Sequence, residues 1–174
     1  MILHDTNILS TFAKINRLDL LFTIFNRTTL HLSGNTETEL QSGVQHSYNI
    51  LQSVLNLIVL PQPAMAFKVV RAGPVQQQLY NQIPFYPQSP QRHLKGEMDT
   101  IALAWTYNAT VVCNERKVYN FCRNNTFQVI PCLKLENLLC RLWMQDLMTQ
   151  TDVQSLITEI ETKDRVHVNH NEVF

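Results

Sequence analysis

The sequence predicts a single α/β domain with a central parallel sheet flanked by helices on both faces, and three observations lead to it. The 174 residues are 45% hydrophobic, which is enough for one domain with a buried core. Short apolar or β-branched runs alternate with longer stretches in which apolar residues recur at helical spacing. No internal repeat or heptad array interrupts this alternation, which is typical of a parallel sheet.

In the first half of the chain, cap and turn residues separate the predicted elements. Ser33 and Thr36 are residue types that cap helices, and Pro61 has no backbone N–H to continue a strand. The elements expected here are strands at 1–4, 28–32 and 57–60, and helices at 9–25 and 36–56.

In the second half, proline-rich and aromatic residues 83–93 indicate a loop, and Pro131 ends the last strand. Thr151 or Asp152 is expected to cap the last helix. The elements expected here are strands at 64–70, 109–113 and 127–130, and helices at 75–82, 97–105, 115–124, 133–148 and 152–160. Residues 1–148 then form the domain, and residues 149–174 form a C-terminal helix and a flexible, polar tail.

Composition excludes several classes of protein. The formal net charge is zero, so binding of nucleic acid needs a local patch or a metal rather than bulk charge. No apolar run reaches the roughly 18 residues of a membrane-spanning helix, and no basic segment of a signal peptide precedes the first apolar residues. A cytoplasmic protein is expected. Its four cysteines lack the Cys-x-x-Cys spacing of zinc sites and are expected to be reduced.

Polar side chains gather at four places along the chain: Asp5, Glu37 with Glu39, Glu97 with Asp99, and Asn114 with Glu115. Asp5 directly follows the first strand, and ligands of open α/β folds bind where strands end. Mg²⁺ and Mn²⁺ prefer oxygen ligands of this kind. The spacing therefore predicts acidic clusters that converge on a divalent cation.

Four motifs resemble those of a PIN domain in their order and spacing over about residues 1–140: Asp5-Thr6-Asn7-Ile8-Leu9, Glu39-Leu40, Gly96-Glu97-Met98-Asp99-Thr100-Ile101-Ala102-Leu103-Ala104, and Val111-Val112-Cys113-Asn114-Glu115. The third motif resembles the Gly-Glu-x-Glu/Asp-x-Ile-x-Leu-Ala helix of PIN-like proteins. PIN domains are metal-dependent ribonucleases, and many are toxins of bacterial toxin–antitoxin pairs. The resemblance implies an endoribonuclease that hydrolyses RNA phosphodiesters with Mg²⁺ or Mn²⁺, with a small antitoxin or a second copy of the chain as further partners.

Carried over by position, the resemblance implies site residues. The catalytic acids are Asp5, Glu39 and Asp99; the metal ligands are Asp5, Asp99, Asn114 and Glu115; and Thr6 and Glu97 are secondary. Asn114 stands where the family usually has Asp, and its amide can ligate a cation but brings no charge. The adjacent Glu115 can reach back in its place. The alternative is a catalytically impaired PIN-fold protein that binds RNA or a protein.

Each acid also has a purely structural interpretation. Asp5 can cap the following helix, and Glu39 can form a capping box with Thr36. Asp99 suits the first turn of a helix because of the macrodipole, and Asn114 with Glu115 can form a simple strand-to-helix turn. Basic residues around the third cluster can contact phosphates or belong to a solvated loop; they are Arg71, Arg92, His93 and Lys95.

Overall fold

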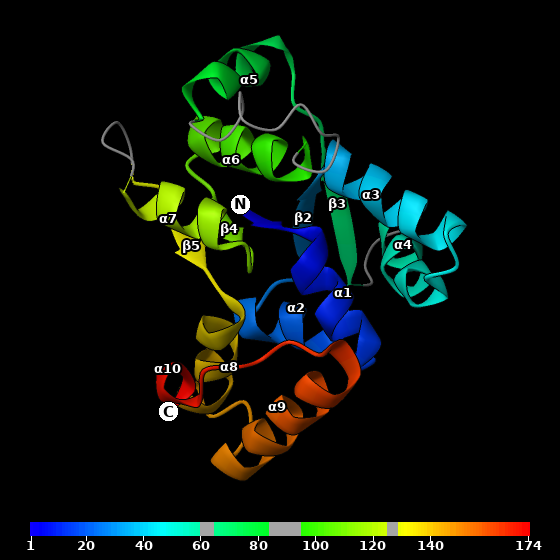
Figure 1. Ribbon diagram of the computed structural model, residues 1–174, viewed down its shortest axis with the longest axis vertical. Helices are drawn as coiled ribbons and strands as arrows, with labels where there is room; N and C mark the ends of the chain where they lie inside the picture. Colours follow the sequence, from blue (N-terminus) through cyan, green and yellow to red (C-terminus); the bar gives the residue numbers. More distant parts are fainter. Residues whose placement is uncertain (60–64, 84–94, 125–128) are drawn as a thin grey trace.

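The computed structural model describes residues 1–59, 65–83, 95–124 and 129–174, and its centre is a parallel sheet (Figure 1). The predicted α/β fold class is confirmed. Five strands within these residues pair in the order β3-β2-β1-β4-β5, and every pair is parallel. The strands are β1 (Ile2–His4), β2 (Thr29–Ser33), β3 (Ala66–Val70), β4 (Thr110–Val112) and β5 (Cys132–Leu133).

The strand order reverses between β1 and β4. From β1 the chain adds β2 and β3 on one side, and it then crosses over to add β4 and β5 on the other. In open α/β folds, such a reversal of strand order is where ligands bind, outside the carboxyl ends of the strands. The ends of β1 and β4 lie side by side, because His4 and Val112 are register partners.

Helices cover both faces of the sheet, as predicted. Leu30, Leu32 and Val112 pack with α1 (Thr6–Lys14), α2 (Asp19–Phe25), α8 (Leu135–Met144) and α9 (Gln150–Asp164). Leu3 and Val111 pack on the opposite face with α6 (Lys95–Tyr107) and α7 (Arg116–Asn124). Neighbouring residues of β4 point to opposite faces, as the pleat requires.

Further helices and turns follow β2 and β3 in the chain. They are α3 (Gly34–Gln45), a 3₁₀ turn (Asn49–Leu51), α4 (Gln52–Val59), α5 (Pro74–Gln78) and a second 3₁₀ turn (Leu79–Gln82). The helix α3 packs against α6 (Figure 1). No helix within the described residues is long and apolar enough to span a membrane.

Three predictions of helices and strands need correction. The single helix expected over 36–56 is interrupted, since α3 ends at Gln45 and the chain continues with the 3₁₀ turn Asn49–Leu51 and α4. The single helix expected over 9–25 is two helices, because the chain turns after Lys14 and Asn16 adopts a positive φ of 55°. The strand expected at 57–60 is wrong for residues 57–59, which belong to α4. Short apolar runs of strand and of buried helix look alike, and here Leu51 and Val54 begin a helical apolar face that Leu55 and Ile58 continue.

The last strand was predicted too early. Val129 and Ile130 are not in a strand, and the strand begins at Cys132. Residues 127–128 of that prediction, and 84–93 of the predicted loop, lie outside the described residues. Pro131 opens the pairing instead of ending it, since its carbonyl accepts from Val111 N at 2.8 Å and its missing N–H costs no bond at this position.

The residues expected to form a flexible tail are packed against the domain in the structure. The helix α9 begins two residues earlier than predicted, with Thr149 as its N-cap, and runs to Asp164. Beyond it, α10 (His170–Val173) packs against α8. Val173 is 1% exposed, and the indole Nε1 of Trp143 donates to its carbonyl oxygen at 2.7 Å.

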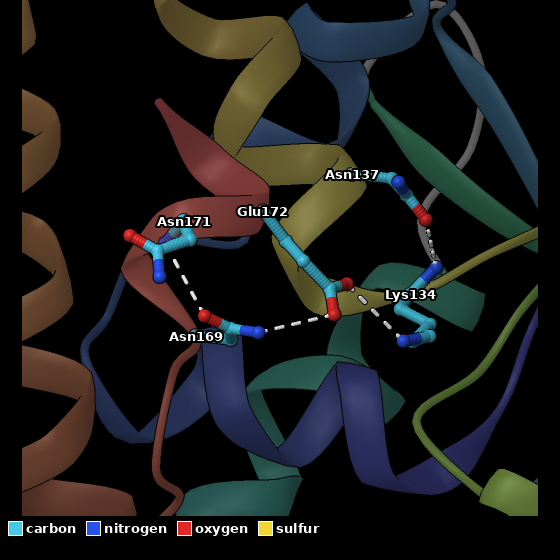
Figure 2. A network of polar contacts seen from close by, with 5 residues as sticks. All are labelled: Lys134, Asn137, Asn169, Asn171 and Glu172. Carbon is cyan, nitrogen blue, oxygen red and sulfur yellow. Dashed lines mark hydrogen bonds and ion pairs between the residues drawn. The ribbon is translucent and has the colours of Figure 1, made fainter.

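Polar contacts fasten this C-terminal segment to the start of α8 (Figure 2). Lys134 Nζ lies 3.2 Å from Glu172 Oε2, and Asn169 Nδ2 donates to Glu172 Oε1 at 3.1 Å. Asn171 N donates to Asn169 Oδ1 at 3.2 Å, which caps α10. Exposed pairs of this kind contribute little free energy. The burial of Val168 and Val173, and not the ion pair, therefore holds the segment in place.

Candidate functional site

Asp5 directly follows the carboxyl end of β1, which pairs with β4 in the sheet. Its backbone N–H continues the ladder to Val112 O at 3.0 Å, and its Oδ1 accepts from Thr6 N at 2.8 Å. Asp5 is therefore the N-cap of α1, as its structural interpretation predicted. Its second oxygen has no such role. The side chain is 2% exposed, and Oδ2 has no hydrogen-bond partner among the described residues.

Glu97, in the first turn of α6, presents a second carboxyl oxygen of this kind. The residue is 9% exposed, and its Oε2 is also buried without a partner in the described part of the chain. Leaving a buried acceptor unsatisfied costs on the order of 1–3 kcal/mol, and more when it is charged. Two such oxygens near each other indicate a place where a ligand would supply the missing contacts.

Glu39 reaches the same place from α3. The hydroxyl of Thr6 donates to Glu39 Oε2 at 2.5 Å. A Cβ on Gly96 would lie 2.6 Å from Glu39 Oε1 and 2.9 Å from Oε2, so only glycine allows this carboxylate to lie against the start of α6. The capping-box interpretation of Glu39 is wrong, since Ser33 is the N-cap of α3 and accepts from Thr36 N at 3.1 Å.

These side chains enclose a cavity of about 590 Å³. Its lining comes from β1, α1, α3 and α6, and consists of Asp5, Thr6, Asn7, Thr38, Glu39, Ser42 and Glu97. We call it the acidic cavity. It lies beyond the carboxyl end of β1, and ligands of open α/β folds bind outside the carboxyl ends of the strands.

Burial and mutual repulsion both raise the proton affinities of the acids. Burial first, and then the charges of Glu97, Glu39 and Glu115, raise the pKa of Asp5 to about 7 against the lowering effect of the Thr6 N–H. Burial likewise raises the pKa of Glu97 to about 7, with Glu39 and Glu115 contributing. Near neutral pH, Asp5 and Glu97 hold protons that exposed acids would have lost.

Asp99 lies elsewhere. The Tyr80 hydroxyl donates to its Oδ1, and the backbone N–H of Asn35 favours its charged form. Burial is the main cause that raises the pKa of Asp99 to about 6. It is 5% exposed and lines a separate cavity of about 620 Å³ with Gly34, Asn35 and Tyr80. The structure therefore brings Asp5, Glu39 and Glu97 together and leaves Asp99 out.

Helix geometry explains this division. Residues two apart on an α-helix point about 200° from each other, so Glu97 and Asp99 cannot face one cavity from α6. That signal was present in the sequence. The motif directed attention to Asp99 as the main acid and to Glu97 as secondary, whereas their positions in α6 reverse that order.

Asn114 and Glu115 follow β4 and are half-buried. Glu115 O accepts from Tyr119 N at 2.9 Å, so this pair also forms the strand-to-helix turn that opens α7. The Glu115 carboxylate still contributes to the high pKa of both Asp5 and Glu97. Its charge therefore acts on the acidic cavity although Glu115 does not line it.

The donor set fits a hard divalent cation in chemistry, because Asp5 and Glu97 each offer a buried carboxyl oxygen without a partner. Within the described residues, no three His, Cys, Asp or Glu side chains are arranged to hold a metal ion as they stand. The cysteines there are free thiols, with the Sγ atoms of Cys113 and Cys132 3.6 Å apart. A cation at Asp5 and Glu97 would need Glu39, an amide oxygen or water to complete its coordination.

Comparisons with protein families, with curated proteins and with solved structures found no match for this chain.

Proposed function

We propose that this protein is a PIN-type endoribonuclease that uses Mg²⁺ or Mn²⁺ in the acidic cavity. One observation carries the proposal: Asp5 Oδ2 and Glu97 Oε2 are buried without hydrogen-bond partners in the described residues and belong to side chains that line one cavity. The order of the four polar motifs along the chain supports the PIN assignment.

The residues of the cavity have different roles in this proposal. Asp5 and Glu97 hold the cation through the oxygens that lack partners. Thr6 orients Glu39, and Gly96 leaves the room that the Glu39 carboxylate occupies. A divalent cation bound here supplies positive charge that polarises a phosphodiester and lowers the pKa of a nearby water.

Asp99 has a positioning role in the proposal instead of a catalytic one. Its contacts with Tyr80 and with the Asn35 backbone tie the 3₁₀ turn Leu79–Gln82 and the start of α3 to α6. Because Glu39 is also on α3, Asp99 helps to set the distance between the Glu39 and Glu97 carboxylates.

A second candidate is a binding module of the same fold that no longer cleaves. Asn114 favours it, because a neutral amide stands at the carboxyl end of β4 where a fourth acid would strengthen cation binding. The toxin role and the antitoxin partner that the resemblance implies remain predictions under either candidate.

Calorimetry of Mn²⁺ and Mg²⁺ binding, followed by cleavage of single-stranded RNA, tests the proposal. The wild type should bind Mn²⁺, and Asp5→Asn and Glu97→Gln should each weaken binding at least about tenfold by removing a charged ligand. Glu136→Gln is the matched control, because Glu136 is also 9% exposed with Oε2 lacking a partner in the described residues, and it does not line the acidic cavity.

Each outcome has a clear consequence. Binding and cleavage that both depend on Asp5 and Glu97 support the nuclease. Metal binding without cleavage supports the binding module. No heat at millimolar Mn²⁺, or an equal loss in Glu136→Gln, contradicts a cation site in the acidic cavity.

A further inference from the structure

Three cavities of the structure form a series in which each cavity shares a lining residue with the next. Thr38 lines both the acidic cavity and the cavity that contains Asp99, which we call the middle cavity. Arg71 lines both the middle cavity and a third of about 360 Å³, which we call the basic cavity. The basic cavity is lined by Met1, His31, Lys68, Val69, Val70, Arg71 and Tyr107.

The two ends of this series differ in charge. The acidic cavity carries the carboxyl groups of Glu39, Glu97 and Asp5, and the basic cavity carries the cations Lys68 and Arg71. In β2 and β3, His31 and Lys68 are register partners and so point to the same face of the sheet. The Nδ1 atom of His31 is buried there and has no hydrogen-bond partner within the described residues.

Arg71 is held at the junction between the middle and basic cavities. Its Nη2 lies 3.0 Å from Glu37 Oε2, while its side chain is 71% exposed against 16% for Glu37. A Cβ on Gly34 would lie 3.2 Å from Arg71 Nη1, so the glycine lets the guanidinium lie close over the first turn of α3. A guanidinium has five donors, and the contact with Glu37 leaves others able to meet a phosphate.

The middle cavity between these ends offers groups that suit nucleobases. Asn35, Gln77 and Asn81 bring amides, which both donate and accept hydrogen bonds. Tyr80 brings an aromatic ring. Grooves that bind single strands commonly combine cations along the backbone with aromatic side chains against the bases.

We propose that the three cavities form one track for a single-stranded RNA, with backbone phosphates at Arg71 and Lys68 and the scissile phosphodiester at the acidic cavity. The position of the scissile phosphodiester rests on the proposed function, whereas the phosphate contacts of Arg71 and Lys68 do not. The physical need is plain: a chain with no net charge and a carboxylate-lined site cannot attract a polyanion without local cations.

The test is fluorescence anisotropy with a labelled single-stranded RNA of about 12 nucleotides. This length is chosen because each cavity holds only a few nucleotides and the strand must span all three. EDTA is present so that neither metal binding nor cleavage contributes. Arg71→Gln combined with Lys68→Gln should weaken binding at least about tenfold. The salt dependence should also become shallower by about 1.4 in log–log slope, as expected for two lost phosphate contacts on a single strand.

Arg17→Gln combined with Lys163→Gln is the matched control. Like Arg71, Arg17 is an exposed arginine paired with one acid, and Lys163 is an exposed lysine paired with Glu159. Neither lines any of the three cavities. These changes should leave the affinity unchanged.

Several results would overturn the track: no RNA binding by the wild type at low salt, equal losses in the control, or equal affinity for a double-stranded RNA or for polyglutamate. The two proposals fail separately. Loss of RNA binding on changing Arg71 and Lys68 without any Mn²⁺ binding leaves the track and removes the nuclease. If Mn²⁺ binds but RNA affinity does not change when Arg71 and Lys68 are replaced, the track is refuted and the nuclease proposal stands.

Discussion

Replacing Asp5 by Asn should stabilise the metal-free protein, and the gain should depend on pH. In the folded state the pKa of Asp5 is raised from 3.8 to about 7, chiefly by burial and then by Glu97 and Glu39. An acid with a raised pKa binds its proton more tightly when folded. Its contribution is therefore harmless below about pH 4, and it destabilises the fold increasingly as pH rises from about 4 to 7.

The size of the effect follows from the same values. One pH unit of pKa difference corresponds to about 1.4 kcal/mol, so ionising Asp5 inside the fold costs about 4 kcal/mol above pH 7. Asn is nearly the same shape, and its Oδ1 can still accept from Thr6 N, so the cap of α1 is kept. We expect Asp5→Asn to raise the free energy of unfolding by about 2–4 kcal/mol at pH 8 and hardly at all at pH 4.

Urea denaturation in EDTA at pH 4, 6 and 8 measures the difference. Asp19→Asn serves as the control, because the Asp19 side chain is 49% exposed and pairs with Arg17 outside the acidic cavity. Added Mn²⁺ should stabilise the wild type at pH 8 and should stabilise Asp5→Asn much less. A change that is the same at pH 4 and pH 8, or a loss of stability at pH 8, would refute the electrostatic reasoning.

Three further predictions concern other parts of the molecule. Gly96→Ala should displace the Glu39 carboxylate, lowering Mn²⁺ affinity at least about tenfold by calorimetry while unfolding free energy changes by under about 1 kcal/mol; a normal affinity contradicts it. Asn114→Asp should lower thermal stability in EDTA and increase the stabilisation that Mn²⁺ gives; the same change in stability with and without Mn²⁺ would mean that Asn114 is not part of the site. Val173→Ala should cost roughly 1–3 kcal/mol in urea, since Val173 is buried, whereas a flexible tail would show no change.

The acidic cavity was only partly predictable from the sequence. Asp5 was identified because its position after a strand is a local property, and its role as N-cap follows from the residues beside it. Glu39 was identified by its motif, but its contact with Thr6 joins α1 to α3 across 33 residues. Glu97 and not Asp99 lines the acidic cavity because of which side of α6 faces it, and helix periodicity could have indicated this.

Other features had weaker local signals. The apolar run 57–60 is compatible with strand or helix, and packing against neighbouring helices selects the helix for residues 57–59. The residues after Asp164 are mostly polar, and two buried valines in this segment, Val168 and Val173, were too few to predict that it packs. Their burial needs a surface that α8 and α9 provide.

The sequence by itself determined the parallel α/β sheet, because alternating strand and helix patterns are set by residues close together in the chain. It also determined that Asp5 stands at a strand end. Only the tertiary structure decided that Glu97 and Glu39 join Asp5, that Asp99 faces another cavity, and that Arg71 links that cavity to Lys68. The physical reason is that periodicity records the backbone state of each segment, whereas convergence depends on how segments distant in sequence pack together.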